Sequence, residues 1–104
     1  MAKAVEFIRK TACDGISVSD VVSFMGMPRR TAERCFREAV GRTIHEEIDE
    51  VRFARVFKLL RNPRQSIDAI SDFCGFKTGG TLRKAFRLRT GLSMREWRKE
   101  TPSP

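Results

Sequence analysis

The chain has 104 residues and a mass of 11.9 kDa, with hydrophobic residues at 40% of its positions and a formal net charge of +8. This length restricts the chain to one small domain, or to two very small lobes with a modest core, and the hydrophobic content is too high for a disordered protein. An apolar run long enough for a transmembrane helix is absent, as is the apolar segment of a secretory signal, so the expected location is the cytoplasm.

Apolar residues recur at spacings of three and four along the whole chain, which predicts an all-α protein. The first helix is expected from residue 2 to about 13. Ser17 then caps a second helix, with Asp20 forming a short capping box, and Gly26 ends it. The residues expected to face the core in these two helices are Ala4, Val5, Ile8, Ala12, Val18, Val21, Val22 and Met25.

A third helix is expected to have Pro28 in its first turn and to end at Gly41. Thr43 caps a longer fourth helix that runs to Leu60, with acidic residues near its start and basic residues near its end, as the helix dipole favours. Asn62 and the proline after it end this helix. The expected inward residues are Ala32, Cys35, Phe36 and Ala39, followed by Ile44, Ile48, Phe53, Val56, Phe57 and Leu60.

Three further helices complete the chain. Ser66 caps a fifth helix that ends at Gly75, a sixth runs roughly over 78–90 to a stop at Gly91, and Ser93 caps a seventh. The expected inward residues are Ile67, Ile70, Cys74, Leu82, Ala85, Phe86, Met94 and Trp97. Residues 101–104 are expected to be disordered.

The second half of the chain repeats the first. FREAVGRTIHE, which starts at Phe36, returns at Phe86 as FRLRTGLSMRE. The repeated unit is a helix, a glycine turn, a second helix, a glycine stop and a capped helix. It predicts seven helices in two helix-turn-helix lobes, with a first lobe at about 3–42, a linking helix at about 43–61 and a second lobe at about 62–100.

The second helix of each unit has one apolar side and one basic side. The outward residues are Arg30, Glu33, Arg34 and Arg37 in the first unit, and Gly80, Arg83, Lys84 and Arg87 in the second. A helix-turn-helix leaves one face of this helix exposed for the major groove, where the arginine fork can bind the O6 and N7 atoms of guanine. The duplicated basic faces therefore favour double-stranded DNA as the partner.

Three alternatives remain open. The basic faces could be an inert solvated surface, an RNA-binding module, or a module that binds a protein or an anionic membrane. An RNA-binding module would need exposed aromatic side chains, whereas the aromatic residues here fall at inward positions. Membrane-surface helices would use apolar faces that the core already requires. No membrane partner is therefore expected.

An enzyme is not expected from these residues. His45 is the single histidine and lies beside acidic residues at a helix start, where a capping or surface role is usual. The three cysteines are odd in number, far apart and without a C-x-x-C spacing, which argues against a disulfide framework or a zinc site. Cys35 and Cys74 fall at apolar positions, which predicts small core residues. No catalytic residue, metal site or cofactor is expected.

Three stretches carry a family resemblance: RFARVFKLL at 52–60, SIDAISDFCGF at 66–76, and LRKAFR with the following GLSMREWR at 82–98. They resemble the DNA-binding domain of the AraC/XylS family, and the resemblance covers about residues 3–100. Within the family, ACDGISVSDV and VGRTIHEEI are most similar to the C-terminal domain of bacterial xylose operon regulators.

The resemblance implies two reading helices in neighbouring major grooves and a nucleoid-associated regulator that activates a sugar operon, often through RNA polymerase. Relatives usually carry a ligand-sensing domain, so the chain resembles an excised C-terminal domain, expected to be monomeric, although stand-alone regulators of this length exist. The implied base-reading residues are Arg30, Glu33, Arg34, Gly80, Thr81 and Lys84. The implied phosphate-binding residues are Ser17, Arg29, Arg37, Ser66, Lys77, Thr78, Arg83 and Arg87.

The pattern departs from the family at Gly79-Gly80, where many relatives place long polar side chains. Each glycine costs a helix interior about 1 kcal/mol relative to alanine, and Gly80 has no side chain to contact a base. We therefore expect the first lobe to carry most of the sequence discrimination and the second to contribute chiefly phosphate affinity. Alternatively, the two glycines allow close approach of the backbone.

Overall fold

The computed structural model describes residues 1–100 and contains, over that range, α-helices and one short 3-10 turn without any strand. The elements are α1 (Ala2–Thr11), η1 (Ala12–Asp14), α2 (Val18–Met25), α3 (Arg29–Val40), α4 (Ile44–Leu60), α5 (Ile67–Cys74), α6 (Gly79–Thr90) and α7 (Met94–Glu100). The predicted all-α fold is confirmed. The expected disorder of 101–104 concerns residues outside the described part.

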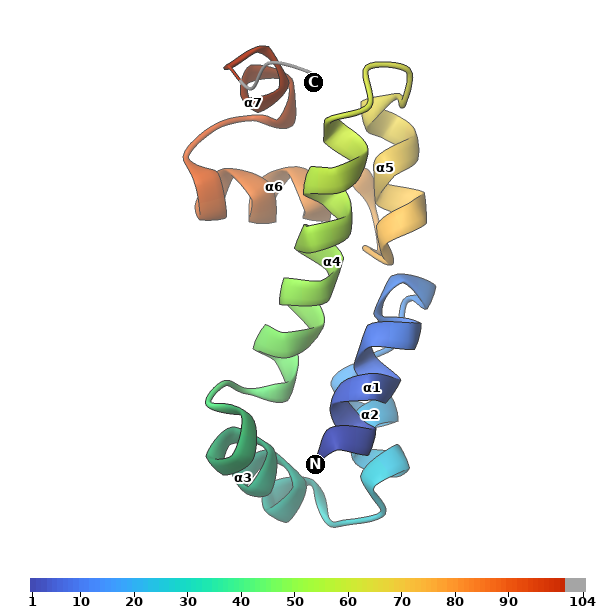
Figure 1. Cartoon of the computed structure of the whole chain (residues 1–104), viewed down its shortest axis with the longest axis vertical. Helices are drawn as coiled ribbons and strands as arrows, with labels where there is room; N and C mark the ends of the chain where they lie inside the picture. Colours follow the sequence, from blue (N-terminus) through green and yellow to red (C-terminus); the bar gives the residue numbers. More distant parts are fainter. Residues whose placement is uncertain (101–104) are drawn as a thin grey trace.

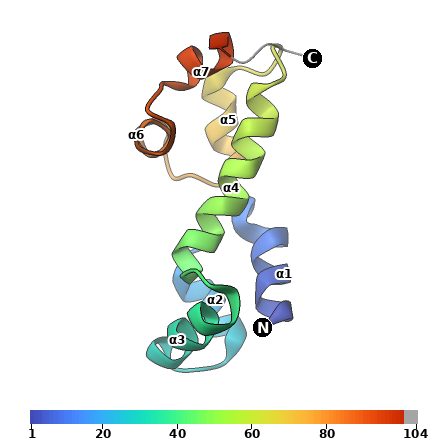
Figure 2. The same cartoon turned by 60° about the vertical axis from the view of Figure 1, so that its left-hand side comes forward.

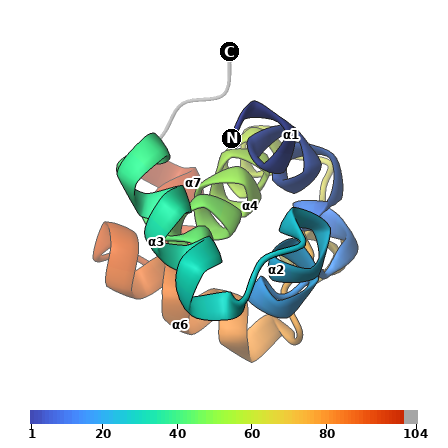
Figure 3. The ribbon, with the colours of Figure 1, turned by 90° about the horizontal axis from the view of Figure 1, so that it is seen from below.

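The helix α4 runs along the middle of an elongated molecule, with extents of 44 × 24 × 21 Å (Figure 1). The first lobe, made by α1, α2 and α3, lies at one end of α4. The second lobe, made by α5, α6 and α7, lies at the other end. Figures 2 and 3 show α3 and α6 on the same side of α4 and α1 on the opposite side. The two helices expected to read DNA therefore face the same side of the molecule.

Each lobe has its own hydrophobic core, and α4 contributes to both. The side chains of Ile44 and Ile48 belong to the first core, and those of Phe53, Val56 and Leu60 to the second. The first core also contains Ala4, Ile8, Ala12, Val21 and Phe36, and the second also contains Ile70, Cys74, Leu82, Phe86 and Met94. The apolar periodicity predicted these buried positions because it follows the helix repeat.

Serine or threonine side chains cap α2, α4, α5 and α7, as the sequence predicted for Ser17, Thr43, Ser66 and Ser93. The Thr43 hydroxyl accepts a hydrogen bond from the Glu46 amide at 3.0 Å, and the Glu46 carboxylate accepts one from the Thr43 amide at 2.8 Å. The bond from the Thr43 amide lowers the pKa of Glu46. Reciprocal capping of this kind satisfies backbone donors that a helix start leaves unpaired.

Several predicted details are wrong. The inward position assigned to Ala39 is exposed, and Cys35 is only partly buried, whereas Cys74 is buried as predicted. Ala39 lies in the last turn of α3, whereas Cys35 lies one turn earlier, next to the buried Phe36. Ala32 and Phe36, which lie on either side of Cys35 in the sequence, are completely buried.

Two helix starts and one helix end also differ from the prediction. Pro28 and Thr78 are the capping residues before α3 and α6 and not residues of their first turns. The first helix ends at Thr11, and residues 12–14 form the tighter 3-10 turn. This turn brings the chain back toward α4, with which η1 is in contact.

Two arginines hold the loops that precede α2 and α5, and neither role was predicted. The Arg52 guanidinium donates hydrogen bonds to the carbonyl oxygens of Ala12 and Ile16 at 2.8 and 2.7 Å. The Arg98 guanidinium donates to those of Leu60 and Gln65 at 3.0 and 2.8 Å. Each arginine thus fixes the loop that leads into the helix-turn-helix of its lobe.

The lobes touch through their backbones at Gly75, the glycine that follows α5. An added Cβ at this position would lie 2.4 Å from the Ala12 carbonyl oxygen and 2.9 Å from the Cys13 Cα. Because real Cβ atoms do not approach other atoms this closely, no side chain fits here. The contact sets how closely the two lobes pack.

No helix in residues 1–100 combines the length and the apolar character that a membrane span requires. In the same range, no group of histidine, cysteine, aspartate and glutamate side chains is arranged to bind a metal ion.

Candidate nucleic-acid interface

The helix α3 buries one side and exposes the other. Ala32 and Phe36 are completely buried, and they hold the helix against the first core. The opposite side carries only exposed polar side chains at the predicted positions, which are Arg30, Glu33, Arg34 and Arg37. The predicted division of this helix into a core side and a basic side is therefore present, apart from Ala39.

The helix α6 repeats this arrangement in the second lobe. Leu82 and Phe86 are completely buried. Phe86 lies among aromatic rings, with its centroid 5.6 Å from that of Phe57 and 6.3 Å from that of Trp97. The outward side carries exposed residues at the predicted positions, which are Gly80, Arg83, Lys84 and Arg87, and Thr81 is exposed as well.

All fourteen predicted DNA-contacting residues are exposed and fall in the two helix-turn-helix segments: Ser17, Arg29, Arg30, Glu33, Arg34, Arg37, Ser66, Lys77, Thr78, Gly80, Thr81, Arg83, Lys84 and Arg87. The structure groups them into two surfaces, one per lobe. Their roles as base-reading or phosphate-binding residues remain predictions.

Some of these side chains are already engaged within the protein. The Arg29 guanidinium lies 3.6 Å from the Glu33 carboxylate and donates a hydrogen bond to the Ser19 hydroxyl at 3.4 Å. Glu33 is the acidic residue on the outward side of α3, and Arg29 compensates its charge. A base contact by Glu33 would require this exposed ion pair to rearrange, and such pairs are weak.

The hydroxyl groups at the helix starts are also engaged. The Thr78 hydroxyl accepts a hydrogen bond from the Thr81 amide at 3.1 Å, and the Ser66 hydroxyl accepts one from the Ala69 amide at 3.1 Å. The Ser17 amide, in contrast, donates to the Asp20 carboxylate at 2.8 Å. A phosphate at these helix starts would thus meet backbone amides more readily at Ser66 than at Ser17.

The glycine pair lies in the first turn of α6, directly after the Thr78 cap. The cost of about 1 kcal/mol for each glycine applies to a helix interior, so the strain expected from the pair is smaller here. An added Cβ at Gly80 would meet only the Thr78 hydroxyl oxygen at 3.8 Å, an ordinary contact. The fold therefore does not require glycine at this position.

Alanine at Gly80 consequently tests the role of the second reading helix without disturbing the fold. We expect G80A to raise the free energy of unfolding by about 0.4–1 kcal/mol, because alanine restricts the unfolded chain. Base preference in the second half-site should stay unchanged, as measured by binding to duplexes randomised there. A sharp change in that preference would show that the backbone or surface at Gly80 takes part in base reading.

Sequence reasoning missed an ionic cluster between the lobes. The Arg42 guanidinium lies 3.2 Å from the Glu47 carboxylate and 3.8 Å from that of Glu50. Arg89, near the end of α6, forms an ion pair with the same Glu50 and lies over the Phe53 ring at 4.7 Å. The spacing of the two glutamates on α4 indicates a shared face, but their partners come from distant parts of the chain. The cluster helps to hold α6 against α4.

Comparisons with known proteins agree with this architecture. A family model described as a helix-turn-helix domain matches residues 21–100. The xylose operon regulatory protein of Escherichia coli strain K12 is 32% identical over 96 residues, which cover 92% of this chain and 24% of that protein. The Msm operon regulatory protein of Streptococcus mutans is 34% identical over 85 residues, covering 82% of this chain and 31% of that protein.

Solved structures give the same result. The DNA-binding domain of the transcriptional factor AdpA, crystallised with a target DNA, superposes with a TM-score of 0.87 at 26% identity and covers 95% of this chain and 89% of that one. The xylose-binding transcription activator xylR superposes with a TM-score of 0.76 at 32% identity, covering 94% of this chain and 26% of that one. The chain thus spans about a quarter of the length of the xylose regulators that it matches. With its duplicated helix-turn-helix architecture, the chain belongs to the AraC-type helix-turn-helix family.

Proposed function

We propose that this chain binds double-stranded DNA sequence-specifically, with α3 and α6 in adjacent major grooves. The observation that carries the proposal is the presence of two exposed, basic helix faces on the same side of α4 (Figures 2 and 3). The AdpA domain, which resembles this chain over 95% of its length, was crystallised on DNA. If the basic surface had no function, there would be no reason for both lobes to carry a basic helix face with the same orientation.

The dimensions of the molecule suit a two-groove complex. The 17 residues of α4 span about 26 Å. Successive major grooves on one side of B-DNA lie about 34 Å apart, within the 44 Å length of the molecule. A site recognised in this way is asymmetric, because the two reading helices differ in sequence. The chain therefore acts as a monomer on two unlike half-sites.

The two lobes have different roles in DNA binding. In the first lobe, Arg30 and Arg34 read bases together with Glu33, whereas Arg29 and Arg37 bind phosphates. In the second lobe, α6 begins with two glycines, so Thr81 and Lys84 supply the remaining base contacts. The first lobe then sets most of the sequence preference, and the second supplies most of its affinity through phosphates.

The chain works as part of a bacterial transcription regulator. We propose that the parent protein also contains a ligand-sensing domain; this is supported by the xylose regulators, of which the chain spans about a quarter. By analogy with the relatives' names, the parent is a cytoplasmic, nucleoid-associated activator of a sugar operon, with xylose as the first candidate, and it recruits RNA polymerase. Its function is binding, and we assign no catalytic step to it.

Selection from random-sequence duplexes, followed by footprinting, tests the proposed function. We expect two protected segments about one helical turn apart on one side of the DNA. Affinity should fall steeply as salt rises, because several lysine and arginine contacts release counterions. Equal affinity for single-stranded RNA would favour an RNA-binding module, and equal affinity for anionic vesicles would favour a membrane-surface module. Either result would contradict sequence-specific duplex binding.

A further inference from the structure

A hollow of about 900 Å³ opens in the second lobe between the start of α5, the middle of α6 and the helix α7. Its walls include a single acidic side chain, Asp68, and the basic side chains Arg83, Arg87, Arg95, Arg98 and Lys99. Such an excess of like charge around one hollow is unfavourable without a compensating anion.

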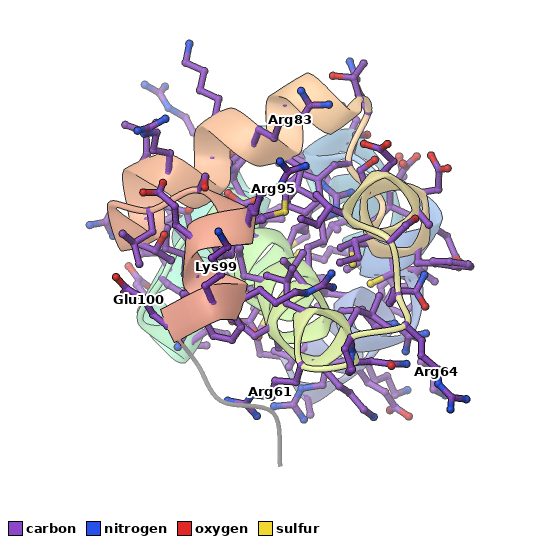
Figure 4. All side chains as sticks on the ribbon, turned by 90° about the horizontal axis from the view of Figure 1, so that it is seen from above. Arg61, Arg64, Arg83, Arg95, Lys99 and Glu100 are labelled. Carbon is purple, nitrogen blue, oxygen red and sulfur yellow. The ribbon has the colours of Figure 1, made fainter. Side chains whose placement is uncertain are left out.

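None of these basic groups forms an ion pair with a carboxylate of the described residues 1–100. Arg98 is committed to the carbonyl oxygens of Leu60 and Gln65. In contrast, no ion pair or hydrogen bond holds Arg83, Arg95 and Lys99, and Arg87 likewise forms no ion pair within residues 1–100. Figure 4 shows Arg83 on α6 close to Arg95 and Lys99 on α7, and all three line the hollow.

The first lobe repeats the backbone of the second without this excess of positive charge, so the fold does not require the basic residues around the hollow. Fifty positions earlier, the counterparts of Arg83, Arg95 and Lys99 are Glu33, His45 and Asp49. There, Glu33 pairs with Arg29, and the His45 ring lies 3.3 Å from the Asp49 carboxylate. The same backbone arrangement therefore carries internally compensated groups in the first lobe and unpaired cations in the second.

We propose that α7 belongs to the DNA interface and that this hollow holds a backbone phosphate at the outer edge of the second half-site. The inference rests on the proposed function. Arg83 lies on the outward side of α6, so a groove that receives α6 brings its phosphates to this hollow. Arg95 and Lys99 then supply the cationic contacts from α7.

This assignment explains how a lobe with a glycine-rich reading helix contributes to binding. Phosphate contacts carry no sequence information, but they fix the register of the protein on the duplex. A second lobe held by α6 and α7 together positions the first lobe over the bases that Arg30 and Arg34 read.

The test uses the double variant R95Q/K99Q, with R64Q, which removes one exposed cation elsewhere in the second lobe, as a control. Arg64 is an exposed cation in the α4–α5 connection, away from the hollow (Figure 4). Affinity for a duplex carrying both half-sites is measured against salt concentration. For R95Q/K99Q, we expect the slope of log affinity against log salt to become shallower by about one to two, with base preference unchanged. R64Q should keep the slope of the unmodified chain.

A second arm locates the contact. Shortening the duplex from the side of the second half-site should lower the affinity of the unmodified chain. The affinity of R95Q/K99Q should change little, because this variant already lacks the contact. Equal slopes of log affinity against log salt for R95Q/K99Q and R64Q would overturn the role of α7. The same conclusion would follow if shortening the duplex lowered the affinity of the two variants equally. The absence of any specific duplex binding by the unmodified chain would instead reject the proposed function itself. Thermal melting of both variants confirms that each is folded.

Discussion

Replacing Gly75 with alanine is expected to destabilise the protein by about 2–5 kcal/mol. Gly75 has φ = 82°, and the left-handed backbone costs an alanine about 1–2 kcal/mol. The added Cβ would also lie 2.4 Å from the Ala12 carbonyl oxygen. Because this atom belongs to the backbone of the other lobe, relief requires the lobes to move apart, at a further cost of about 1–3 kcal/mol. Urea unfolding measures the loss.

Gly26 provides the matched control because it occupies the same position in the first lobe. Its φ is 69°, and an added Cβ would meet nothing within 4 Å. G26A should therefore show only the backbone cost of about 1–2 kcal/mol. G75A should in addition weaken binding to a duplex with two half-sites more than binding to either half-site alone. Equal losses of stability in the two variants would contradict a lobe contact at Gly75.

Removing Arg30 and Arg34 together is expected to abolish most of the specific affinity for DNA. Each bidentate base contact contributes about 1–3 kcal/mol of discrimination, so the double variant R30A/R34A should lose roughly 30-fold to 20,000-fold in specific affinity. The preference for particular bases in the first half-site should flatten, whereas non-specific binding at low salt should fall much less. Titration of selected and scrambled duplexes separates the two quantities.

Two comparisons make this result interpretable. R9A removes an exposed arginine from α1, on the opposite side of α4, and should leave specific affinity almost unchanged (Figure 2). K84A removes a predicted base-reading residue of the second lobe and should have a smaller effect than R30A alone. A larger effect of K84A on base preference would contradict the assignment of most sequence discrimination to the first lobe.

Most of the fold followed from the sequence because the signals are local. A capping residue such as Ser17, a glycine stop such as Gly41 and an apolar repeat each act within one or two helical turns. The exposed sides of α3 and α6 followed from the same periodicity. The error at Ala39 arose because periodicity gives the side of a helix on which a residue lies, but not how far the neighbouring helices extend along it.

The missed features depend on residues far apart in the chain. Arg52 reaches carbonyl groups about forty residues earlier, and Gly75 touches the backbone of residues 12–13. Nothing in the local pattern distinguishes Arg52 from the exposed Arg55 on the same helix, since only the folded chain brings the acceptors of Arg52 within reach. The hollow beside α7 was not predicted for the same reason, because Arg95 and Lys99 lie near Arg83 only once α7 has packed beside α6.

The sharing of α4 between two cores has a consequence for how the protein loses its structure. If the second lobe comes apart, Phe53, Val56 and Leu60 enter water, and the half of α4 that carries them loses the packing that keeps it helical. That helix also supplies Ile44 and Ile48 to the other lobe, so heat melts the duplicated halves as one cooperative body. Because the two lobes share α4, neither lobe has to be stable by itself. The surface charges of the two lobes can therefore differ while the protein stays folded.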